Sequence, residues 1–277
     1  MNYAGIDIGS RTIEVVVVSG DSGKIICALQ ADTGFDPIAE ARRLLASIEY
    51  KGIKYERIMA TGYGRTLFEV AFEDDPDKNS DPVMEIGTVT EIKAHAKGVT
   101  AYFPDASTIL DIGGQDSKVI ALNEKSRVKK FEMNDRCAAG TGKFLEIMAK
   151  TLGFTIDEFG NEALLAQNDL TINSMCTVFA ESEVTSLIAK GSDRREIAKG
   201  VHISVIKRAA SMISRVRTEK NITTQKAEFI VFTGGVAKNQ CMVKLLAEKL
   251  ACDILVPDNP QMIGAFGAAL IASEQNS

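Results

Sequence analysis

Tryptophan is absent from the 277-residue sequence, histidine occurs only twice and proline six times, and no apolar run approaches the ~20 residues of a membrane span. The apolar content of 45% and the shortage of proline exclude a disordered or collagen-like chain. The first residues also lack the basic and then apolar pattern of a signal peptide. These absences predict a globular, cytoplasmic protein that does not contact membranes.

Basic residues are not in excess either, because 32 Lys and Arg stand against 37 Asp and Glu and leave a net charge of -5. A negative net charge disfavours sequence-independent binding to nucleic acid, so we expect no nucleic-acid partner. The five cysteines are an odd number, which argues against a disulfide framework in a reducing compartment. Free thiols or metal ligands are the better interpretations.

A pattern of strand, turn and strand occurs twice in the chain. Segment 5–9 (Gly-Ile-Asp-Ile-Gly) and segment 110–114 (Leu-Asp-Ile-Gly-Gly) each lead into an apolar, strand-like stretch, and their aspartates, Asp7 and Asp111, are 104 residues apart. The repeat predicts an α/β protein with two similar lobes, each containing a β-hairpin. We expect lobe I at 1–104, lobe II at 105–259, and a C-terminal helix at 260–277 that packs back on lobe I.

Periodicity and turn residues predict the other elements. The acidic segment 73–82 is expected to be a surface loop. Beyond the two hairpins, we expect strands at 24–30, 57–61, 228–233 and 253–256, and helices at 36–49, at 83–98, after Cys137, after Cys176 and from Pro260.

A strand that ends in Asp-x-Gly places a carboxylate beside a turn with accessible backbone N–H groups, a pairing that suits a magnesium phosphate. One copy alone is better explained as an aspartate that caps its own turn, but the duplication favours a polyphosphate site. We expect Asp7 and Asp111 to hold Mg²⁺ through its waters, and Gln115 to contact the attacking water or the metal. The expected nucleotide contacts are Gly9, Ser10, Arg11, Thr12, Gly113, Gly114, Gln115, Gly234, Gly235 and Asn239.

The order of these motifs separates this chain from other nucleotide-binding folds. Two Asp-x-Gly hairpins, a Gly234-Gly235 turn and a final helix rich in small residues resemble the actin-like ATPase fold of sugar kinases, actin and heat-shock ATPases. A P-loop or a dinucleotide motif would need other glycine spacings, and neither occurs after the first strand. The segment 139–143 has the wrong spacing for a P-loop.

Cys137 and Cys176 each stand at or just before a predicted helix, whose amino terminus favours anions such as an iron-sulfur cluster. Two ligands cannot complete such a site, but two copies in a twofold dimer would supply four. From the residues alone, a cluster, a zinc ion and inert thiols all remain open. Cys27, Cys241 and Cys252 are interpreted as small apolar residues.

Over nearly its whole length the sequence resembles the activator components of 2-hydroxyacyl-CoA dehydratases, which are similar to the ATPase subunits of benzoyl-CoA reductases. The two most specific motifs are Asn-Asp-Arg-Cys-Ala-Ala-Gly-Thr-Gly at 134–142 and Cys-Thr-Val-Phe-Ala-Glu-Ser-Glu at 176–183. Segments 60–65, 111–116 and 233–237 support them. The acidic segment 73–82 departs from the family pattern and resembles an insertion, which bears on the choice of partner.

This resemblance implies a homodimer with one bridging [4Fe-4S] cluster, ligated by Cys137 and Cys176 of both subunits, and MgATP bound between the lobes of each subunit. It implies that ferredoxin or flavodoxin supplies electrons in anaerobic metabolism. ATP binding and hydrolysis would change the angle between the cluster helices and send a low-potential electron to a partner dehydratase or double-cubane-type reductase. The alternatives are a small-molecule kinase of the same fold and a zinc-bridged regulatory ATPase.

Overall fold

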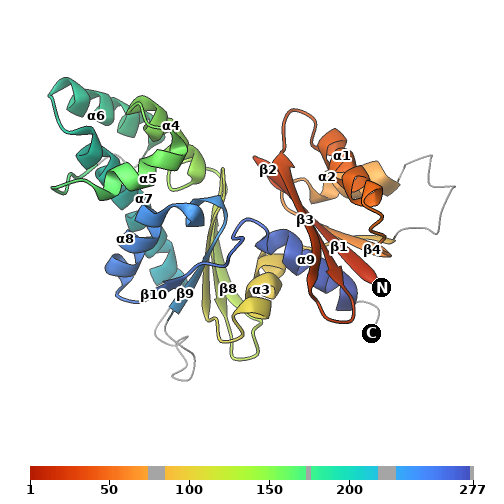
Figure 1. The fold of residues 1–277 in the computed structure, drawn as a ribbon. Coiled ribbons are helices and arrows are strands. Elements are labelled where there is room, and N and C mark those ends of the chain that lie inside the picture. The colour runs from red at the N-terminus through yellow and green to blue at the C-terminus, as the bar shows by residue number, and fades with distance from the viewer. Residues whose placement is uncertain (74–84, 173–175, 218–228, 275–277) are drawn as a thin grey trace. The chain divides into compact units, whose positions relative to one another are not determined.

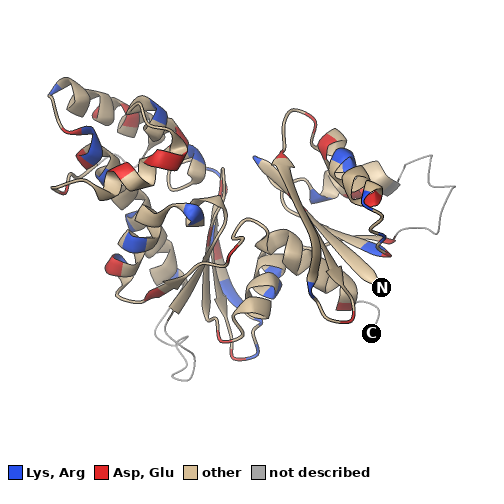
Figure 2. Ribbon diagram, in the orientation of Figure 1, with Lys and Arg blue, Asp and Glu red and all other residues tan. Residues whose placement is uncertain are grey.

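The computed structural model of the chain describes residues 1–73, 85–172, 176–217 and 229–274 (Figure 1). The chain forms two compact units: unit 1 contains residues 1–104 and 261–277, and unit 2 contains residues 105–260. Each unit is built on one five-stranded sheet. Basic and acidic side chains are interspersed over the helices of both units (Figure 2).

The sheet of unit 1 has the strand order β3-β2-β1-β4-β5. Its first three strands are antiparallel neighbours, whereas β4 and β5 run parallel to β1. Burial is nearly continuous along β1 and β2, as expected for inner strands whose two faces are both covered. The strands are β1 (Asn2–Ile8), β2 (Thr12–Ser19), β3 (Ile25–Asp32), β4 (Arg57–Thr61) and β5 (Glu85–Thr88).

Helices cover both faces of this sheet (Figure 1). On one face, α1 (Pro37–Tyr50) and α2 (Arg65–Glu73) bury Leu44 and Phe68 against the even-numbered residues of β1. On the other face lie α3 (Glu91–Tyr102) and α9 (Ile263–Glu274). The C-terminal helix therefore belongs to the core of unit 1.

The sheet of unit 2 repeats this topology in the order β10-β9-β6-β7-β8. The strands β6 and β7 form the second antiparallel hairpin, and β9 runs parallel to β6 as β4 does to β1. The strands are β6 (Thr108–Ile112), β7 (Ser117–Leu122), β8 (Val128–Asn134), β9 (Phe229–Thr233) and β10 (Asp253–Leu255).

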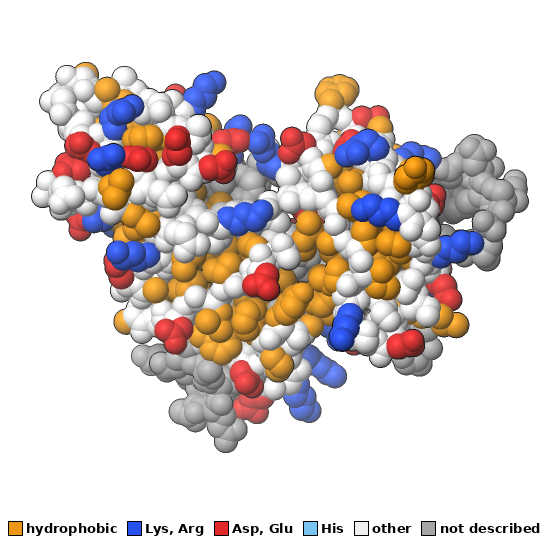
Figure 3. Space-filling view, viewed as in Figure 1, with side chains coloured by type: hydrophobic (Ala, Val, Ile, Leu, Met, Phe, Trp, Pro, Cys, Tyr) orange, Lys and Arg blue, Asp and Glu red, His pale blue; other side chains and the backbone are white. Residues whose placement is uncertain are grey.

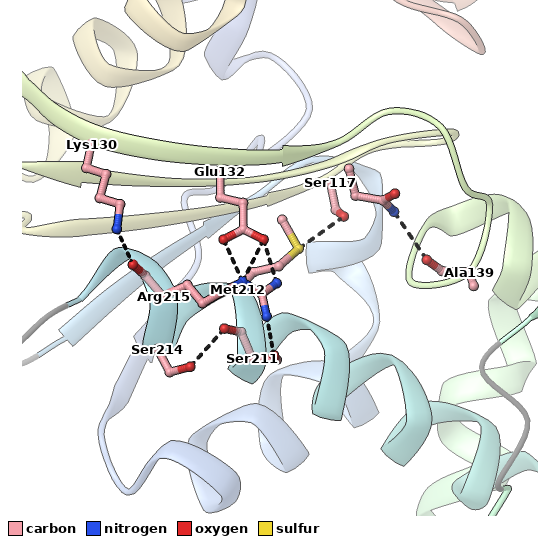
Figure 4. A network of polar contacts seen from close by, with 9 residues as sticks. Ser117, Lys130, Glu132, Ala139, Ser211, Met212, Ser214 and Arg215 are labelled. Atoms are coloured by element: carbon pink, nitrogen blue, oxygen red, sulfur yellow. Dashed lines mark hydrogen bonds and ion pairs between the residues drawn. The ribbon is translucent and has the colours of Figure 1, made fainter.

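Unit 2 carries more helices than unit 1 among the described residues, and its apolar core is correspondingly larger. Polar contacts also tie β8 to α7 (Figure 4): Lys130 Nζ donates to the Arg215 carbonyl oxygen at 2.5 Å, and Arg215 Nε donates to both Glu132 carboxylate oxygens at 2.9 and 3.0 Å. The helices are α4 (Gly142–Thr151), α5 (Ile156–Leu164), α6 (Thr177–Ala189), α7 (Arg194–Val216), the 3-10 helix η3 (Gly235–Lys238) and α8 (Gln240–Leu250).

Apolar side chains also reach the surface of the units (Figure 3). On α6 the exposed ones are Val178 (66%), Phe179 (68%) and Ile188 (38%). Within the residues that the structure describes, no helix is both long enough and apolar enough to span a membrane.

In unit 1, one sequence prediction of secondary structure was wrong. The helix expected at 83–98 is a strand, β5, followed by α3, because Thr90 has extended backbone and its hydroxyl accepts from Lys93 N at 3.4 Å as the helix cap. Helix α2, which the sequence analysis did not predict, ends at Glu73. The rest of the predicted acidic loop, residues 74–82, lies outside the described residues.

Candidate nucleotide and cluster sites

The two Asp-x-Gly turns have the same backbone closure. Gly9 N donates to Thr12 O at 3.0 Å in unit 1, and Gly113 N donates to Asp116 O at 3.0 Å in unit 2. Each bond joins the two strands of its hairpin, so the residues between them lie at the hairpin tip. Ser10, Arg11 and Gln115 are exposed there, and Gly9, Thr12, Gly113 and Gly114 are half-buried.

A second repeated feature stands beside each aspartate. Thr61, on the parallel strand β4, lies in register with Asp7. Thr233, on β9, lies in register with Asp111. A glycine with positive φ follows each threonine, Gly62 at 86° and Gly234 at 84°. The sequence analysis assigned Gly234 to the nucleotide but missed its counterpart in unit 1, although a Thr-Gly pair ends both strands.

In unit 2 the aspartate is buried and its charge is balanced. Asp111 is 2% exposed; its Oδ2 lies 3.2 Å from Lys118 Nζ, and its Oδ1 accepts from Thr233 Oγ1 at 2.8 Å. Lys118 Nζ also lies 2.6 Å from Asp116 Oδ2. Removing Lys118 would leave the buried Asp111 carboxylate without its counter-ion, whereas removing Asp111 would leave Lys118 its ion pair with Asp116. Sequence reasoning did not single out Lys118.

In unit 1 the position that corresponds to Lys118 holds a carboxylic acid. Glu14 pairs with Asp7 across β1 and β2 as Lys118 pairs with Asp111, and it is only 4% exposed. Burial first, and then the neighbouring Asp7, raise the pKa of Glu14 from 4.5 to about 8. Gln30 Nε2 donates to Glu14 Oε1 at 3.0 Å. Neither Glu14 nor this pairing was predicted.

The Asp7 carboxylate lies close to the first turn of α9. A Cβ on Gly264, the second residue of that helix, would overlap Asp7 Oδ2 and would lie 3.1 Å from His95 Cε1. Asp7 is half-buried, in contrast to Asp111. The sequence analysis had interpreted the small residues of this helix as a packing feature, and at Gly264 they also make room for a predicted metal-site residue.

The threonine hydroxyls of the two units differ. Thr61 is fully buried, and its Oγ1 has no hydrogen-bond partner among the described residues, whereas Thr233 Oγ1 bonds to Asp111. A buried hydroxyl without a partner costs about 1–3 kcal/mol. Strand β4, beside the first hairpin, therefore carries an unsatisfied hydroxyl, whereas the equivalent hydroxyl on β9 is bonded.

Asn239, a predicted nucleotide contact, already has structural roles. Its Oδ1 accepts from Met242 N at 3.2 Å and so caps α8, and its Nδ2 lies 3.0 Å from His202 Nε2. Burial lowers the pKa of His202 to about 4, so the ring is neutral at pH 7. With the proton on Nδ1 donated to Ala198 O at 2.7 Å, Nε2 accepts from Asn239. This contact holds the turn after Gly235 in place.

The second turn is bonded directly to α4. Gly142 N donates to Gly113 O at 2.9 Å, and Lys143 N donates to Gly114 O at 2.7 Å. These are the first two N–H groups of α4, which a helix cannot satisfy internally. A shift of the Gly113-Gly114 turn would therefore carry the start of α4 with it.

The expected helix start at Cys137 was wrong, and the one at Cys176 is confirmed. Cys137 precedes α4 by five residues, because positive φ at Gly140 and the cap at Thr141 delay the helix. Asn134 Nδ2 donates to Cys137 O at 2.9 Å and to Ala139 O at 3.3 Å, which holds the cysteine loop against β8. Cys176 is the N-cap residue of α6 and is exposed.

The other thiols differ from these two. Cys241 is buried, and desolvation raises its pKa to about 12. Cys27 and Cys252 pack against the apolar cores of units 1 and 2. No group of three or more His, Cys, Asp or Glu side chains in the described parts of the chain is arranged to hold a metal ion. A metal here would need donors from a ligand or from a second chain.

Comparison with known proteins places this geometry in context. Residues 4–272 match the family model described as the BadF/BadG/BcrA/BcrD ATPase family. The activator of lactoyl-CoA dehydratase from Anaerotignum propionicum is 43% identical over 277 residues, covering 99% of this chain and 98% of that protein.

Two solved structures are similar over the same length. The activator of 2-hydroxyisocaproyl-CoA dehydratase from Clostridium difficile with bound ADPNP has a TM-score of 0.83 at 35% identity, and the alignment covers 99% of this chain and 95% of that one. Component A of (R)-2-hydroxyglutaryl-CoA dehydratase from Acidaminococcus fermentans has a TM-score of 0.86 at 33% identity, with 99% and 98% covered. These likenesses confirm the actin-like ATPase fold and the predicted resemblance to dehydratase activators.

Proposed function

Because the chain belongs to the BadF/BadG/BcrA/BcrD ATPase family, we propose that it couples ATP hydrolysis to the transfer of a low-potential electron. The acceptor in this proposal is a partner 2-hydroxyacyl-CoA dehydratase or a related reductase, and 43% identity to the activator of lactoyl-CoA dehydratase supports it. The observation that carries the proposal is the pair of hydrogen bonds between the Gly113-Gly114 turn and α4, since they join a phosphate-type turn to the helix that follows Cys137.

For the nucleotide, we assign the phosphates to the exposed backbone of the two hairpin tips. Asp7 and Asp111 would hold the waters of Mg²⁺, and Gln115, which is exposed at the second tip, would orient the attacking water. Gly234 and Gly235 would allow the backbone to approach the nucleoside. The Asn239 side chain then acts by holding η3 and α8 rather than by touching the base.

For the electron carrier, we assign Cys137 and Cys176 as the two ligands that each subunit of a homodimer gives to one [4Fe-4S] cluster. The two thiols fit half of such a site, since both are free, Cys176 is exposed and Cys137 is half-buried. The cluster, when bound, supplies one-electron redox chemistry at low potential. Asn134 keeps the Cys137 loop in one conformation, and the first N–H groups of α6 follow Cys176 as hydrogen-bond donors for anionic sulfur.

The hydrogen bonds between the Gly113-Gly114 turn and α4 would couple the nucleotide site to the cluster site. A change in the phosphates at Gly113 and Gly114 would move their carbonyl oxygens, and with them the amides of Gly142 and Lys143. Helix α4 packs against α6, so both cysteine segments would respond. Thermodynamic linkage requires the effect to be reciprocal, so the state of the cluster must also change nucleotide affinity. Chelation of cluster iron should then be slower or faster with ADP than with a non-hydrolysable ATP analogue, and equal rates would contradict the coupling.

The proposed cellular setting is an anaerobic cytoplasm. Ferredoxin or flavodoxin would supply the electron, and the acyl-CoA substrate would bind to the partner enzyme alone. This division of work predicts that the isolated chain hydrolyses ATP and shows no dehydratase activity of its own.

The test is an anaerobic purification followed by iron and acid-labile sulfide analysis and by electron paramagnetic resonance after reduction with dithionite. We expect four irons and four sulfides per dimer, a reduced-cluster signal and ATP hydrolysis. A colourless, iron-free protein that phosphorylates a small molecule would establish the kinase alternative. A colourless dimer with stoichiometric zinc would establish the regulatory ATPase instead.

A further inference from the structure

The Gly113-Gly114 turn of unit 2 is held by a residue that has no role so far, Asp116. Its carbonyl oxygen accepts from Gly113 N at 3.0 Å and closes the hairpin. Its side chain also lies against the turn, because a Cβ on Gly113 would be only 2.5 Å from Asp116 Oδ1. The main chain and the side chain of one residue therefore both fix the position of Gly113.

The Asp116 carboxylate is in turn anchored in the sheet. Its Oδ2 lies 2.6 Å from Lys118 Nζ, and the exposed fraction is 25% for the Asp116 side chain and 4% for the Lys118 side chain. The same ammonium group lies 3.2 Å from Asp111 Oδ2. A buried ammonium group is retained only where anionic partners offset its loss of water. The ion pair thus ties the tip of the hairpin to a cation whose position is fixed by the sheet.

On its other side the turn is packed against the start of α4. Gly113 O and Gly114 O accept from Gly142 N at 2.9 Å and from Lys143 N at 2.7 Å. The space is tight, since a Cβ on Gly142 would be 3.0 Å from Gly113 O and 3.4 Å from Gly114 Cα. A turn that is anchored by Asp116 and packed in this way can shift only together with the start of α4.

The first hairpin does not have this anchor. There Gly9 N closes onto Thr12 O, so Thr12 stands in the place of Asp116, and Glu14 stands in the place of Lys118. A threonine and a glutamic acid cannot form an ion pair. The anchor is therefore found in the unit that also contains the two cysteine segments.

We propose that Asp116 is a positioning residue, which through its ion pair with Lys118 holds the Gly113-Gly114 turn in the conformation needed for ATP hydrolysis and for coupling to the cluster. This inference rests on the proposed function, because it requires phosphates at that turn. Backbone N–H groups stabilise developing phosphate charge only when they are fixed in place. A turn without the anchor can rearrange by itself, and it then passes less of a change in the phosphates on to α4.

The test compares Asp116→Ala with the wild type, both as anaerobic, cluster-loaded dimers. We expect kcat for ATP hydrolysis to fall about tenfold to a hundredfold, the cost of misplacing groups around a reacting centre by about 1 Å. The rates of iron chelation by bathophenanthroline with ADP and with a non-hydrolysable ATP analogue should become more similar than in the wild type. Lys118 keeps its contact with Asp111, so the melting temperature without nucleotide should stay within about 4 °C of the wild type.

The matched control is Glu132→Ala, which removes a carboxylate that pairs with Arg215 in the same unit. It should keep the wild-type kcat and the wild-type ratio of chelation rates. A wild-type kcat or a wild-type ratio in Asp116→Ala would overturn the inference, and so would equal losses in Glu132→Ala. A much lower melting temperature of Asp116→Ala would overturn it as well, because the role would then be structural. A wild-type dimer that holds no iron or hydrolyses no ATP would instead overturn the proposed function.

Discussion

The two hairpins of this protein have nearly the same backbone and opposite chemistry. Strand order, register and the Thr-Gly step beside each aspartate are repeated, yet position 14 is a glutamic acid and position 118 is a lysine. In unit 2 the buried charge is paired, and the turn is bonded to α4. In unit 1 two carboxyl groups face each other beside an unsatisfied hydroxyl. The two units thus share backbone geometry, while the charged residues at equivalent positions differ, and with them the roles that the two hairpins can have.

The largest expected effect is confined to unit 2. Cys176→Ala, like Cys137→Ala, should abolish the [4Fe-4S] cluster and electron transfer, because one substitution removes two of four ligands in a dimer. Nucleotide binding should survive, since neither cysteine belongs to the hairpin tips. The dimer should dissociate more readily on dilution, because it no longer shares a metal centre.

Iron content, calorimetric ADP affinity and sedimentation measure these three effects. Cys27→Ala in unit 1 is the matched control and should leave all of them unchanged, since Cys27 packs in the core of unit 1. Four irons per dimer in Cys176→Ala would disprove the ligand assignment. Complete loss of ADP binding in the same variant would disprove the claim that the nucleotide site forms without the cluster.

The next largest effect is expected when the buried ion pair between Lys118 and Asp111 in unit 2 is removed. Lys118→Met should cost about 3–5 kcal/mol of unfolding free energy, because it leaves the buried Asp111 carboxylate without its counter-ion. Urea unfolding monitored by circular dichroism measures the loss. The double variant Lys118→Met with Asp111→Asn should recover most of it, since no buried charge then remains. A single variant as stable as the wild type would contradict the ion pair.

Catalysis should also distinguish the units. Asp111→Asn should slow ATP hydrolysis about 10²–10³-fold, the size of effect seen when one positioned group that stabilises a transition state is removed. The cluster content should stay at the wild-type level, because the change does not touch the cysteine segments. Turnover assays under anaerobic conditions, with iron analysis of the same sample, test this. Hydrolysis at the wild-type rate would remove Asp111 from the mechanism.

The two units should also differ in the pH dependence of their stability. The pKa of Glu14 is about 8 in the folded chain and 4.5 ordinarily, so the stability associated with the protonated carboxyl is present below pH 4.5 and is lost as the pH rises to about 8. Around Glu14, Asp7 raises this pKa, and Thr12, Gln30 and His95 lower it. Glu14→Gln should therefore melt higher than the wild type at pH 8.5, with a smaller difference at pH 5.

Unit 2 should respond to pH in the opposite direction. The pKa of His202 is about 4 in the folded chain and 6.5 ordinarily. The stability gained from the neutral ring is therefore present above pH 6.5 and is lost as the pH falls towards 4. Melting curves of the wild type and of Glu14→Gln from pH 4 to pH 8.5 measure both trends. Identical pH profiles of the two proteins would contradict the raised pKa of Glu14.

Sequence analysis anticipated the features that local pattern controls. Both hairpins were predicted from runs of β-branched residues, and the helix after Asp36 from its cap and from Pro37. Segment 85–88 was assigned to a helix because its few residues carry no periodic signal, and pairing with β4 makes it a strand. The helix near Cys137 was placed too early because the turn at Gly140 delays it.

What the sequence determined by itself was the repeated hairpin, its two aspartates and the two cysteine motifs, since each of these is encoded by neighbouring residues. Only the tertiary structure decided which groups surround the aspartates. Lys118 bonds to Asp111, Glu14 faces Asp7, and Thr61 lies in register with Asp7 although 54 positions separate them along the chain. Strand register brings such distant residues together, and burial then changes the electrostatic cost of their charges, so neither effect can be read from local pattern.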